Sequence, residues 1–297
     1  TAVVEYVLSA IAMSGHLQSI LRGTPVGIVG LGAVGGHLAK RLLSLGCQVV
    51  GHDPLVTHWP SGVLKGDLQA VLNQTVVSLH ASLHDQLPFA SQGLMGIAEA
   101  EGMLAASATR SQPGLFINAG RGGLVTPQAL EYLLASAWTT VLDTWPTEPS
   151  LDGSLLAQCD WVSPHIAGHS SGAKRRGSDM LAHAVAQWGD QIGLARPAIG
   201  AAAITQEPMP PTLTNLICEA GEAPGDVMER FLHQSSVLAR EDARLRQGAT
   251  PHVTTELFDR LRQSYEQPSE WTGTQLQVSA GSTAIVTALT QLGVAVS

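Results

Sequence analysis

Short apolar runs alternate with segments of helical periodicity over most of the chain. Residues 26–29 form such a run, and Val34, Leu38 and Leu42 follow at intervals of four, which indicates a strand, a glycine turn and a helix. Further strands are expected at 48–51, 76–79, 115–118, 140–143 and 161–163, with helices near 67–73, 97–108, 126–136 and 152–158. Strands that alternate with helices predict an α/β fold with a doubly wound parallel sheet of the Rossmann type.

The pattern is different at the two ends of the chain. An amphipathic helix precedes the first strand, and a long helix from about Ser171 to Asp190 follows the last one. One face of this long helix carries Met180, Leu181, Ala184, Val185 and Trp188. A stretch rich in alanine and proline, from Arg196 to Pro211, indicates a linker. The helical and apolar segments after it predict a small C-terminal α+β unit.

Composition narrows the class of protein. The 297 residues are 44% hydrophobic and 13% charged, which predicts a folded chain of about two domains. The formal charge of −8 argues against a nucleic-acid or anionic-membrane surface, and no apolar run is long enough to span a bilayer. The three cysteines are scattered, which favours a reducing, cytoplasmic location over a disulfide framework.

A glycine-rich turn, GLGAVG at residues 30–35, joins the first strand to its helix. In this GxGxxG pattern the first glycine permits a tight turn, the second lets the backbone approach a pyrophosphate, and the third lets helix and strand pack closely. Amides at the start of the helix then receive the negative charge. The pattern predicts a dinucleotide site formed by Gly30, Gly32, Ala33, Val34 and Gly35.

Asp53 ends the second predicted strand, 18 residues after Gly35. A carboxylate there accepts hydrogen bonds from the adenosine ribose and repels a 2′-phosphate, so it favours NAD over NADP. The alternative interpretation is a solvated turn residue before Pro54.

Three titratable side chains follow predicted strands, at the edge where ligands of such sheets bind. Arg121 lies in NAGRG, Glu148 in WPTEP and His165 in PHIAG. An arginine, a carboxylate and a histidine at one edge can hold a substrate carboxylate, orient an imidazole and transfer a proton. Taken singly, Arg121 can also be a surface ion-pair residue and Glu148 a turn residue before proline.

The motifs GLGAVG, INAGRGG, VLDTWPTEP and SPHIAG occur in this order, with Asp53 after the first. In these motifs the sequence resembles the D-isomer-specific 2-hydroxyacid dehydrogenases, over nearly its whole length. The first helix (VVEYVLSA), the residues Lys174, Arg176 and Gly177, and the tail segments EDARLR and FDRLRQSYEQPSEW are similar to one branch of this family. The enzymes of that branch oxidise 4-phospho-D-erythronate in pyridoxal 5′-phosphate (vitamin B6) biosynthesis.

The resemblance implies an NAD-dependent oxidation to 2-oxo-3-hydroxy-4-phosphobutanoate with Arg121, Glu148 and His165 as catalytic residues. His165 would take the proton of the 2-hydroxyl while the hydride of C2 passes to the nicotinamide. A neutral imidazole is an adequate base at neutral pH, and Glu148 would orient it and stabilise the imidazolium. Arg121 would grip the substrate carboxylate and polarise the C2 oxygen.

The resemblance also implies further binding residues. On the cofactor side they are Ala81, Ala119, Gly120, Arg121, Asp143 and Gly168, and on the substrate side Arg121, His169, Lys174 and Arg176. Ala81 stands where the family has a dinucleotide-contacting threonine, so one hydroxyl contact is lost. His169 stands where the branch usually has a substrate-contacting tyrosine. Lys174 and Arg176 are expected to reach the substrate phosphate, although such a charged run is ordinarily a solvated helix face.

No metal is expected. The sequence has two histidines, His165 and His169, with Cys159 nearby, which are residue types that can bind zinc. However, Pro164 and the turn at Gly168 keep the two histidines from lying on one face of a helix.

The expected division is a linking helix over 1–24, an NAD-binding Rossmann domain over 25–168, a return helix and linker over 169–205, and an α+β dimerisation domain over 206–297. A homodimer is implied by the resemblance. In the family, a flavodoxin-like part of the substrate domain precedes the first helix, and it is expected to be absent here. A polypeptide that begins at Thr1 would then bind NAD but turn over poorly, because one wall of the cleft is missing.

Two other functions stay open. Another D-2-hydroxyacid dehydrogenase, of the phosphoglycerate or glyoxylate type, carries similar motifs and differs in substrate preference. A dinucleotide-sensing binding protein would keep the fold without catalysis, and the complete set of Arg121, Glu148 and His165 speaks against it.

Overall fold

A computed structural model describes residues 2–110, 112–192, 212–219, 221–249, 251–268, 270–279 and 282–296 of the chain. The whole of the predicted linker at 196–211 lies outside these described residues.

A parallel seven-stranded sheet forms the centre of the structure, with the strand order β3-β2-β1-β4-β5-β6-β8. The strands follow one another outward in both directions from the neighbouring β1 and β4, with β2 and β3 on one side and β5, β6 and β8 on the other. The predicted doubly wound parallel sheet is therefore confirmed. All residues of the central strands β1, β4 and β5 are buried, because helices cover both faces of the sheet. The strands are β1 (Val26–Val29), β2 (Val49–His52), β3 (Leu64–Lys65), β4 (Val76–Leu79), β5 (Leu115–Asn118), β6 (Thr139–Leu142) and β8 (Trp161–Val162).

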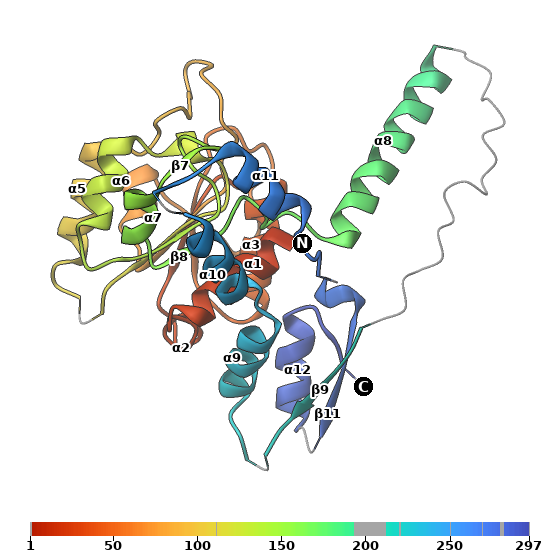
Figure 1. Cartoon of the computed structure of the whole chain (residues 1–297). Coiled ribbons are helices and arrows are strands. Elements are labelled where there is room, and N and C mark those ends of the chain that lie inside the picture. The colour runs from red at the N-terminus through yellow and green to blue at the C-terminus, as the bar shows by residue number, and fades with distance from the viewer. Residues whose placement is uncertain are drawn as a thin grey trace.

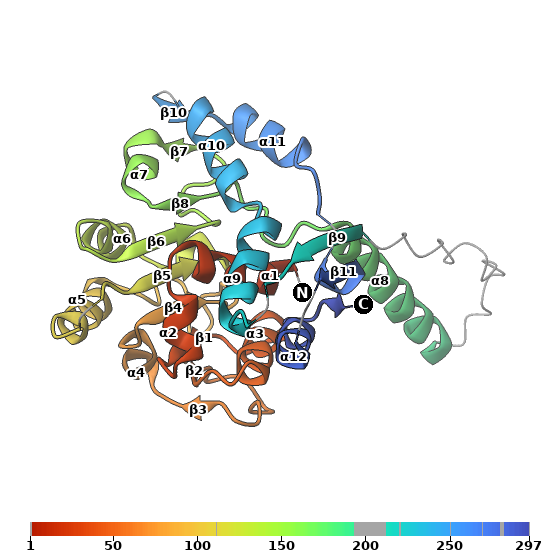
Figure 2. The same ribbon diagram turned by 90° about the horizontal axis from the view of Figure 1, so that it is seen from below.

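Two apolar clusters fill the two sides of the sheet. Figures 1 and 2 show the helices that lie on its two faces. Successive residues of a strand point to opposite faces, so Ile117 joins one cluster and Phe116 the other. The first cluster contains residues of α1 (Ala2–Met13), α2 (Leu17–Leu21) and α3 (Ala33–Ser44). The second contains residues of α4 (Leu68–Leu72), α5 (Ile97–Ser107), α6 (Pro127–Leu134) and α7 (Gly153–Gln158).

The C-terminal residues form a second, three-stranded parallel sheet with the order β12-β11-β9. Its outer strand β9 was not predicted from the sequence. Helix α9 packs against both α1 and α12, so residues of this unit share the first apolar cluster. The elements are β9 (Thr212–Ile217), α9 (Pro224–Ser235), α10 (Leu238–Gly248), α11 (Thr255–Gln263), β11 (Thr274–Ser279), α12 (Thr283–Gln291) and β12 (Ala295–Val296).

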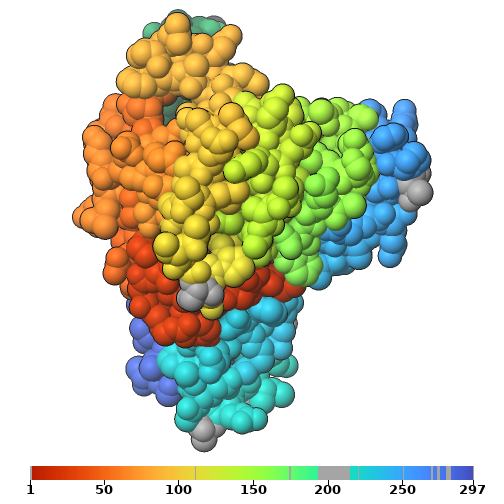
Figure 3. All heavy atoms as spheres, turned by 90° about the vertical axis from the view of Figure 1, so that its left-hand side faces the viewer, coloured from red at the N-terminus to blue at the C-terminus, as the bar shows by residue number. Residues whose placement is uncertain are grey.

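Helix α10 closes the β8 edge of the large sheet. The Val162 N–H of this edge strand donates to the Asp242 carboxylate at 2.9 Å, and Arg246 donates to the carbonyl oxygens of Leu156 and Cys159. Beside it, β7 (Leu151–Asp152) pairs with β10 (His252–Val253). Figure 3 shows the blue C-terminal residues beside the green residues that precede them at this end of the molecule. The Val162 N–H, which would otherwise be unpaired at this edge of the sheet, is thereby satisfied.

Helix α8 (Ser171–Gln191) extends away from the sheet (Figure 1). It carries the apolar face expected from the sequence, but Met180, Leu181, Val185 and Trp188 are between 57% and 73% exposed. None of the described helices, α8 included, is long and apolar enough to cross a membrane.

Phe231 on α9 anchors the C-terminal residues in the shared cluster. Its side chain is buried, and its ring meets Trp271 edge to face with centroids 5.5 Å apart. We expect Phe231→Ala to lower the free energy of unfolding by about 3–5 kcal/mol, because it removes a buried ring and leaves a cavity.

Urea unfolding measures this change. The control is Tyr132→Ala, at a side chain that is 42% exposed on α6, where the change should stay within about 0.5 kcal/mol. Equal losses in the two variants would contradict the shared core.

Candidate active site

The parallel register brings five strand ends to one edge of the sheet. Val29, Leu79, Asn118, Leu142 and Val162 lie in one aligned row across β1, β4, β5, β6 and β8. The residues that come next in the chain are Gly30, His80, Ala119, Asp143 and Ser163. A cleft of about 700 Å³ opens at this edge. Chemistry-bearing loops from distant parts of the sequence therefore meet in one place.

Most of the residues predicted for the site line this cleft. They are Gly30, Gly32, Ala33, Val34, Asp53, Ala81, Ala119, Gly120, Arg121, Asp143, His165, Gly168 and His169. Three histidines that the sequence did not single out, His52, His80 and His84, also line it, as does the loop around Pro88 and Phe89.

The glycine turn and Asp53, predicted to bind the dinucleotide, lie together at one end of the cleft. Gly35 lies so close beneath the turn that a Cβ there would be 1.9 Å from the carbonyl oxygen of Gly30, whereas a Cβ at Gly32 would meet nothing within 4 Å. Helix α3 starts directly after Gly32. The Asp53 carboxylate accepts the N–H groups of Leu31 at 2.7 Å and Leu55 at 2.9 Å, so it also holds the turn. The open turn and helix terminus fit a pyrophosphate.

Asn118 holds the loop that carries Arg121. Its amide nitrogen donates to the carbonyl oxygen of Arg121 at 3.0 Å, and its carbonyl oxygen accepts from the Gly120 N–H and the Thr144 hydroxyl. The Arg121 guanidinium donates to the carbonyl oxygen of Gly120 and is exposed at the cleft. The hydrogen bonds of Asn118 thus fix the backbone that carries Arg121.

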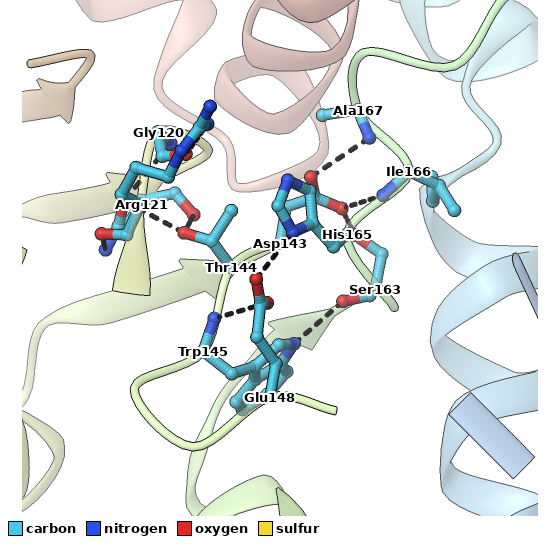
Figure 4. Close-up of polar contacts among 11 residues, drawn as sticks. Gly120, Arg121, Asp143, Thr144, Trp145, Glu148, Ser163, His165, Ile166 and Ala167 are labelled. Carbon is cyan, nitrogen blue, oxygen red and sulfur yellow. Dashed lines mark hydrogen bonds and ion pairs between the residues drawn. The ribbon is translucent and has the colours of Figure 1, made fainter. Parts of the chain in front are cut away.

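Glu148 and His165 face each other, with Oε1 of Glu148 2.8 Å from Nδ1 of His165 (Figure 4). The second oxygen, Oε2, accepts the Trp145 N–H at 3.1 Å. Burial alone would raise the pKa of Glu148, but the hydrogen bonds from His165 and Trp145 and the charges of His165 and Arg262 hold it below its usual value. An ionised carboxylate on Nδ1 leaves Nε2 as the nitrogen able to accept a proton.

His165 has an unusual backbone conformation, with a φ of +54°. Among described non-glycine residues it alone has a positive φ. Asp143 grips the two residues after it, since Oδ1 accepts the Ile166 N–H at 2.8 Å and Oδ2 accepts the Ala167 N–H at 3.0 Å (Figure 4). The buried Asp143 therefore fixes the turn that presents the imidazole.

Lys174 and Arg176, which are predicted to bind the substrate phosphate, are not among the described side chains that line the cleft. Arg176 forms hydrogen bonds to the buried Glu270 carboxylate, which also accepts from the Ser170 hydroxyl. The side chain of Lys174 lies outside the described residues. The described part of the chain holds no group of three or more potential metal ligands.

The chain matches the family model described as D-isomer specific 2-hydroxyacid dehydrogenase, NAD binding domain, over residues 9–167. It is 33% identical to erythronate-4-phosphate dehydrogenase of Klebsiella pneumoniae (strain 342), over 98% of this chain and 73% of that protein. Identity to the enzyme of the same name from Cellvibrio japonicus (strain Ueda107) is also 33%, over 98% and 74%.

Two solved structures share the fold. The NAD complex of D-isomer specific 2-hydroxyacid dehydrogenase from Lactobacillus delbrueckii ssp. bulgaricus aligns with a TM-score of 0.50 at 21% identity, over 66% of this chain and 67% of that one. The glyoxylate/hydroxypyruvate reductase of Sinorhizobium meliloti, solved with NADP and sulfate, aligns with a TM-score of 0.50 at 22% identity, over 65% and 66%. At such identities the likeness supports the Rossmann fold alone.

Gly122 marks the closest approach between the Arg121 and Glu148 loops. A Cβ at Gly122 would lie 2.0 Å from the backbone carbonyl of Trp145. We expect Gly122→Ala to push the loops apart and to cost about 1–3 kcal/mol of stability in chemical denaturation.

The matched control is Gly189→Ala in α8, where a Cβ would meet no atom within 4 Å. Alanine there should stabilise the helix by up to about 1 kcal/mol. Stability of Gly122→Ala at or above that of the wild type would contradict the close contact.

Proposed function

The chain belongs to the D-isomer specific 2-hydroxyacid dehydrogenases, and within them to the erythronate-4-phosphate dehydrogenases, and we propose that it oxidises 4-phospho-D-erythronate with NAD. The product is 2-oxo-3-hydroxy-4-phosphobutanoate, in the biosynthesis of pyridoxal 5′-phosphate. The observation that carries this proposal is the Glu148–His165 pair, whose histidine lines the same cleft as Arg121 in an NAD binding domain.

The residues of the nucleotide end fit NAD. The turn at 30–35 would hold the pyrophosphate. Asp53 would accept a ribose hydroxyl through Oδ2, which among the described residues accepts only the Leu31 N–H, whereas Oδ1 already accepts the N–H groups of Leu55 and Val56. Ala81, Ala119, Gly120, Asp143 and Gly168 would line the nicotinamide end. When bound, NAD accepts the hydride that leaves C2 of the substrate.

His165 serves as the general base. Its Nε2 takes the proton of the substrate 2-hydroxyl, and the imidazolium that forms is stabilised by the ionised Glu148 on Nδ1. The low pKa of Glu148 matters here, because a protonated carboxyl would not stabilise the positive charge.

Arg121 binds the substrate carboxylate. A guanidinium can pair with a carboxylate through two parallel hydrogen bonds, which fixes C2 relative to His165. It also polarises the C2 oxygen as the carbonyl forms. His169 lines the cleft next to Gly168 and would contact the substrate, and Lys174 and Arg176 are retained as candidates for its phosphate.

A homodimer and a cytoplasmic location belong to the same proposal. The outer strand β9 ends at Ile217, which is 75% exposed, and an exposed apolar residue on a sheet edge is typical of an association surface. The three cysteines are buried and scattered, as in proteins of reducing compartments.

A substrate panel tests the reaction. With NAD, the full-length protein should show its highest kcat/KM for 4-phospho-D-erythronate, compared with D-erythronate, 3-phospho-D-glycerate and glycolate, as measured by NADH formation. Preference for an unphosphorylated acid would contradict the proposed substrate. Binding of NAD without turnover of any acid would favour the dinucleotide-sensing alternative.

His165→Asn should lower kcat/KM by about 10²- to 10⁴-fold, because the proton acceptor is lost. Glu148→Gln should have a smaller effect and move the acidic limb of the pH profile to lower pH, since an imidazolium without its carboxylate partner forms less readily. Stopped-flow kinetics over pH, with NAD affinity measured separately, checks both. A large loss of NAD affinity in either variant would contradict these roles.

A further inference from the structure

The left-handed turn at His165 is held by more than Asp143. A non-glycine residue with positive φ persists only where its surroundings determine its conformation, because the backbone is strained there. Asp143 supplies two backbone contacts to this turn, and it is itself buried in the protein. A buried carboxylate needs a fixed set of donors, so its third partner decides where it points.

That partner is Ser163, two residues before His165. The Ser163 hydroxyl donates to Oδ1 of Asp143 at 2.6 Å, and Figure 4 shows these two side chains. The hydroxyl oxygen of Ser163 also lies 2.7 Å from the Tyr6 hydroxyl. A serine hydroxyl has one hydrogen, which here goes to Asp143, so Tyr6 must donate to Ser163. A chain of three buried groups thus runs from helix α1 to the His165 turn.

Ser163 also connects to the other half of the catalytic pair. Its carbonyl oxygen accepts the indole N–H of Trp145 at 3.0 Å, and the backbone N–H of Trp145 donates to Glu148. The side chain of Ser163 therefore acts on the turn of His165, while its main chain acts on the loop of Glu148.

From these contacts we infer that Tyr6 and Ser163 are positioning residues, which act through Asp143 to hold the His165 imidazole against Glu148 in the reactive geometry. This inference rests on the proposed function for its kinetic consequence. Packing alone does not require the two hydroxyls, because phenylalanine and alanine would fill nearly the same volume without burying polar groups.

Helix α1, which carries Tyr6, is thereby coupled to the position of His165. Glu5, next to Tyr6, accepts the Trp271 N–H at 3.1 Å, and α1 packs against α9. The position of Tyr6 is therefore set from both the large sheet and the C-terminal residues. Tyr6 and Ser163, the two residues that position His165, are 157 residues apart in the sequence.

The test compares Ser163→Ala and Tyr6→Phe with Ser163→Thr, which keeps a hydroxyl, in the full-length protein. Ser163→Ala should lower kcat by about tenfold or more, with the KM for NAD nearly unchanged, because misplacing the base affects the chemical step. Tyr6→Phe should cause a smaller loss, and Ser163→Thr should restore most of the activity. The double variant should be no slower than Ser163→Ala, since Tyr6 acts through Ser163.

The matched control is Tyr265→Phe. Tyr265 is buried and lines the same small cavity as Tyr6, but it has no hydrogen bond to another described residue. Loss of the Tyr265 hydroxyl should leave kcat unchanged. Equal effects of Tyr6→Phe and Tyr265→Phe, or additive effects of Tyr6→Phe and Ser163→Ala, would overturn the inference.

Hydrogen exchange gives a readout that is independent of turnover. Amide exchange of the segment 163–168 should quicken in Ser163→Ala and Tyr6→Phe and stay unchanged in Tyr265→Phe. Unchanged protection in Ser163→Ala would overturn the positioning role. If the wild type oxidises none of the acids, the proposed function fails, and this exchange comparison alone decides the inference.

Discussion

The parallel hydrogen-bonded register of the large sheet is the constraint on which the site depends. Strands aligned in one direction end at one edge, so Gly30, Ala119, Asp143 and Ser163 lie along the same edge although more than a hundred residues separate the first from the last. Each loop that leaves this edge needs only a short excursion to reach the cleft. The seven-stranded order also fixes which loops adjoin: the loop of Glu148 leaves β6 and the turn of His165 leaves β8, and these two strands pair directly.

In an acidic protein that binds anionic ligands, the carboxylates at the binding site would repel the ligand unless their charge is compensated. Arg121 is the one lysine or arginine among the described residues that line the cleft, whereas Asp53 and Asp143 also lie there. Both aspartates are turned inward by backbone donors: Asp53 holds the glycine turn and Asp143 holds the His165 turn. Their negative charge is thereby balanced locally, and the N-terminal end of α3, at Gly32, Ala33 and Val34, lines the cleft. The net charge of −8 therefore does not describe the field that a ligand meets.

The sequence predicted the sheet, its order of elements and the residues around the cleft because these are carried by local patterns: a glycine turn, a run of apolar residues, a motif after each strand. The part that could not be predicted consists of contacts between distant segments. Tyr6 shows no signal as a partner of Ser163, and Glu270 shows none as a partner of Arg176, since neither pair shares a motif or a spacing. The strand at Thr212–Ile217 was missed because its pattern, TLTNLI, is short and follows a proline-rich stretch. The apolar face of α8 was recognised, but periodicity predicts only that such a face exists and not what covers it.

Stability and reactivity are joined in the same few contacts. The core near His165 contains a carboxylate, two hydroxyls and an indole N–H, all buried and all hydrogen-bonded to one another or to the backbone. A fully satisfied polar network of this kind fixes one conformation, whereas an apolar core of the same volume would tolerate several. It is needed because His165 has a backbone conformation that no local preference of the chain would maintain. The fold therefore uses buried polar groups where a well-packed apolar core would be simpler, and the reason is the strained turn that carries the imidazole.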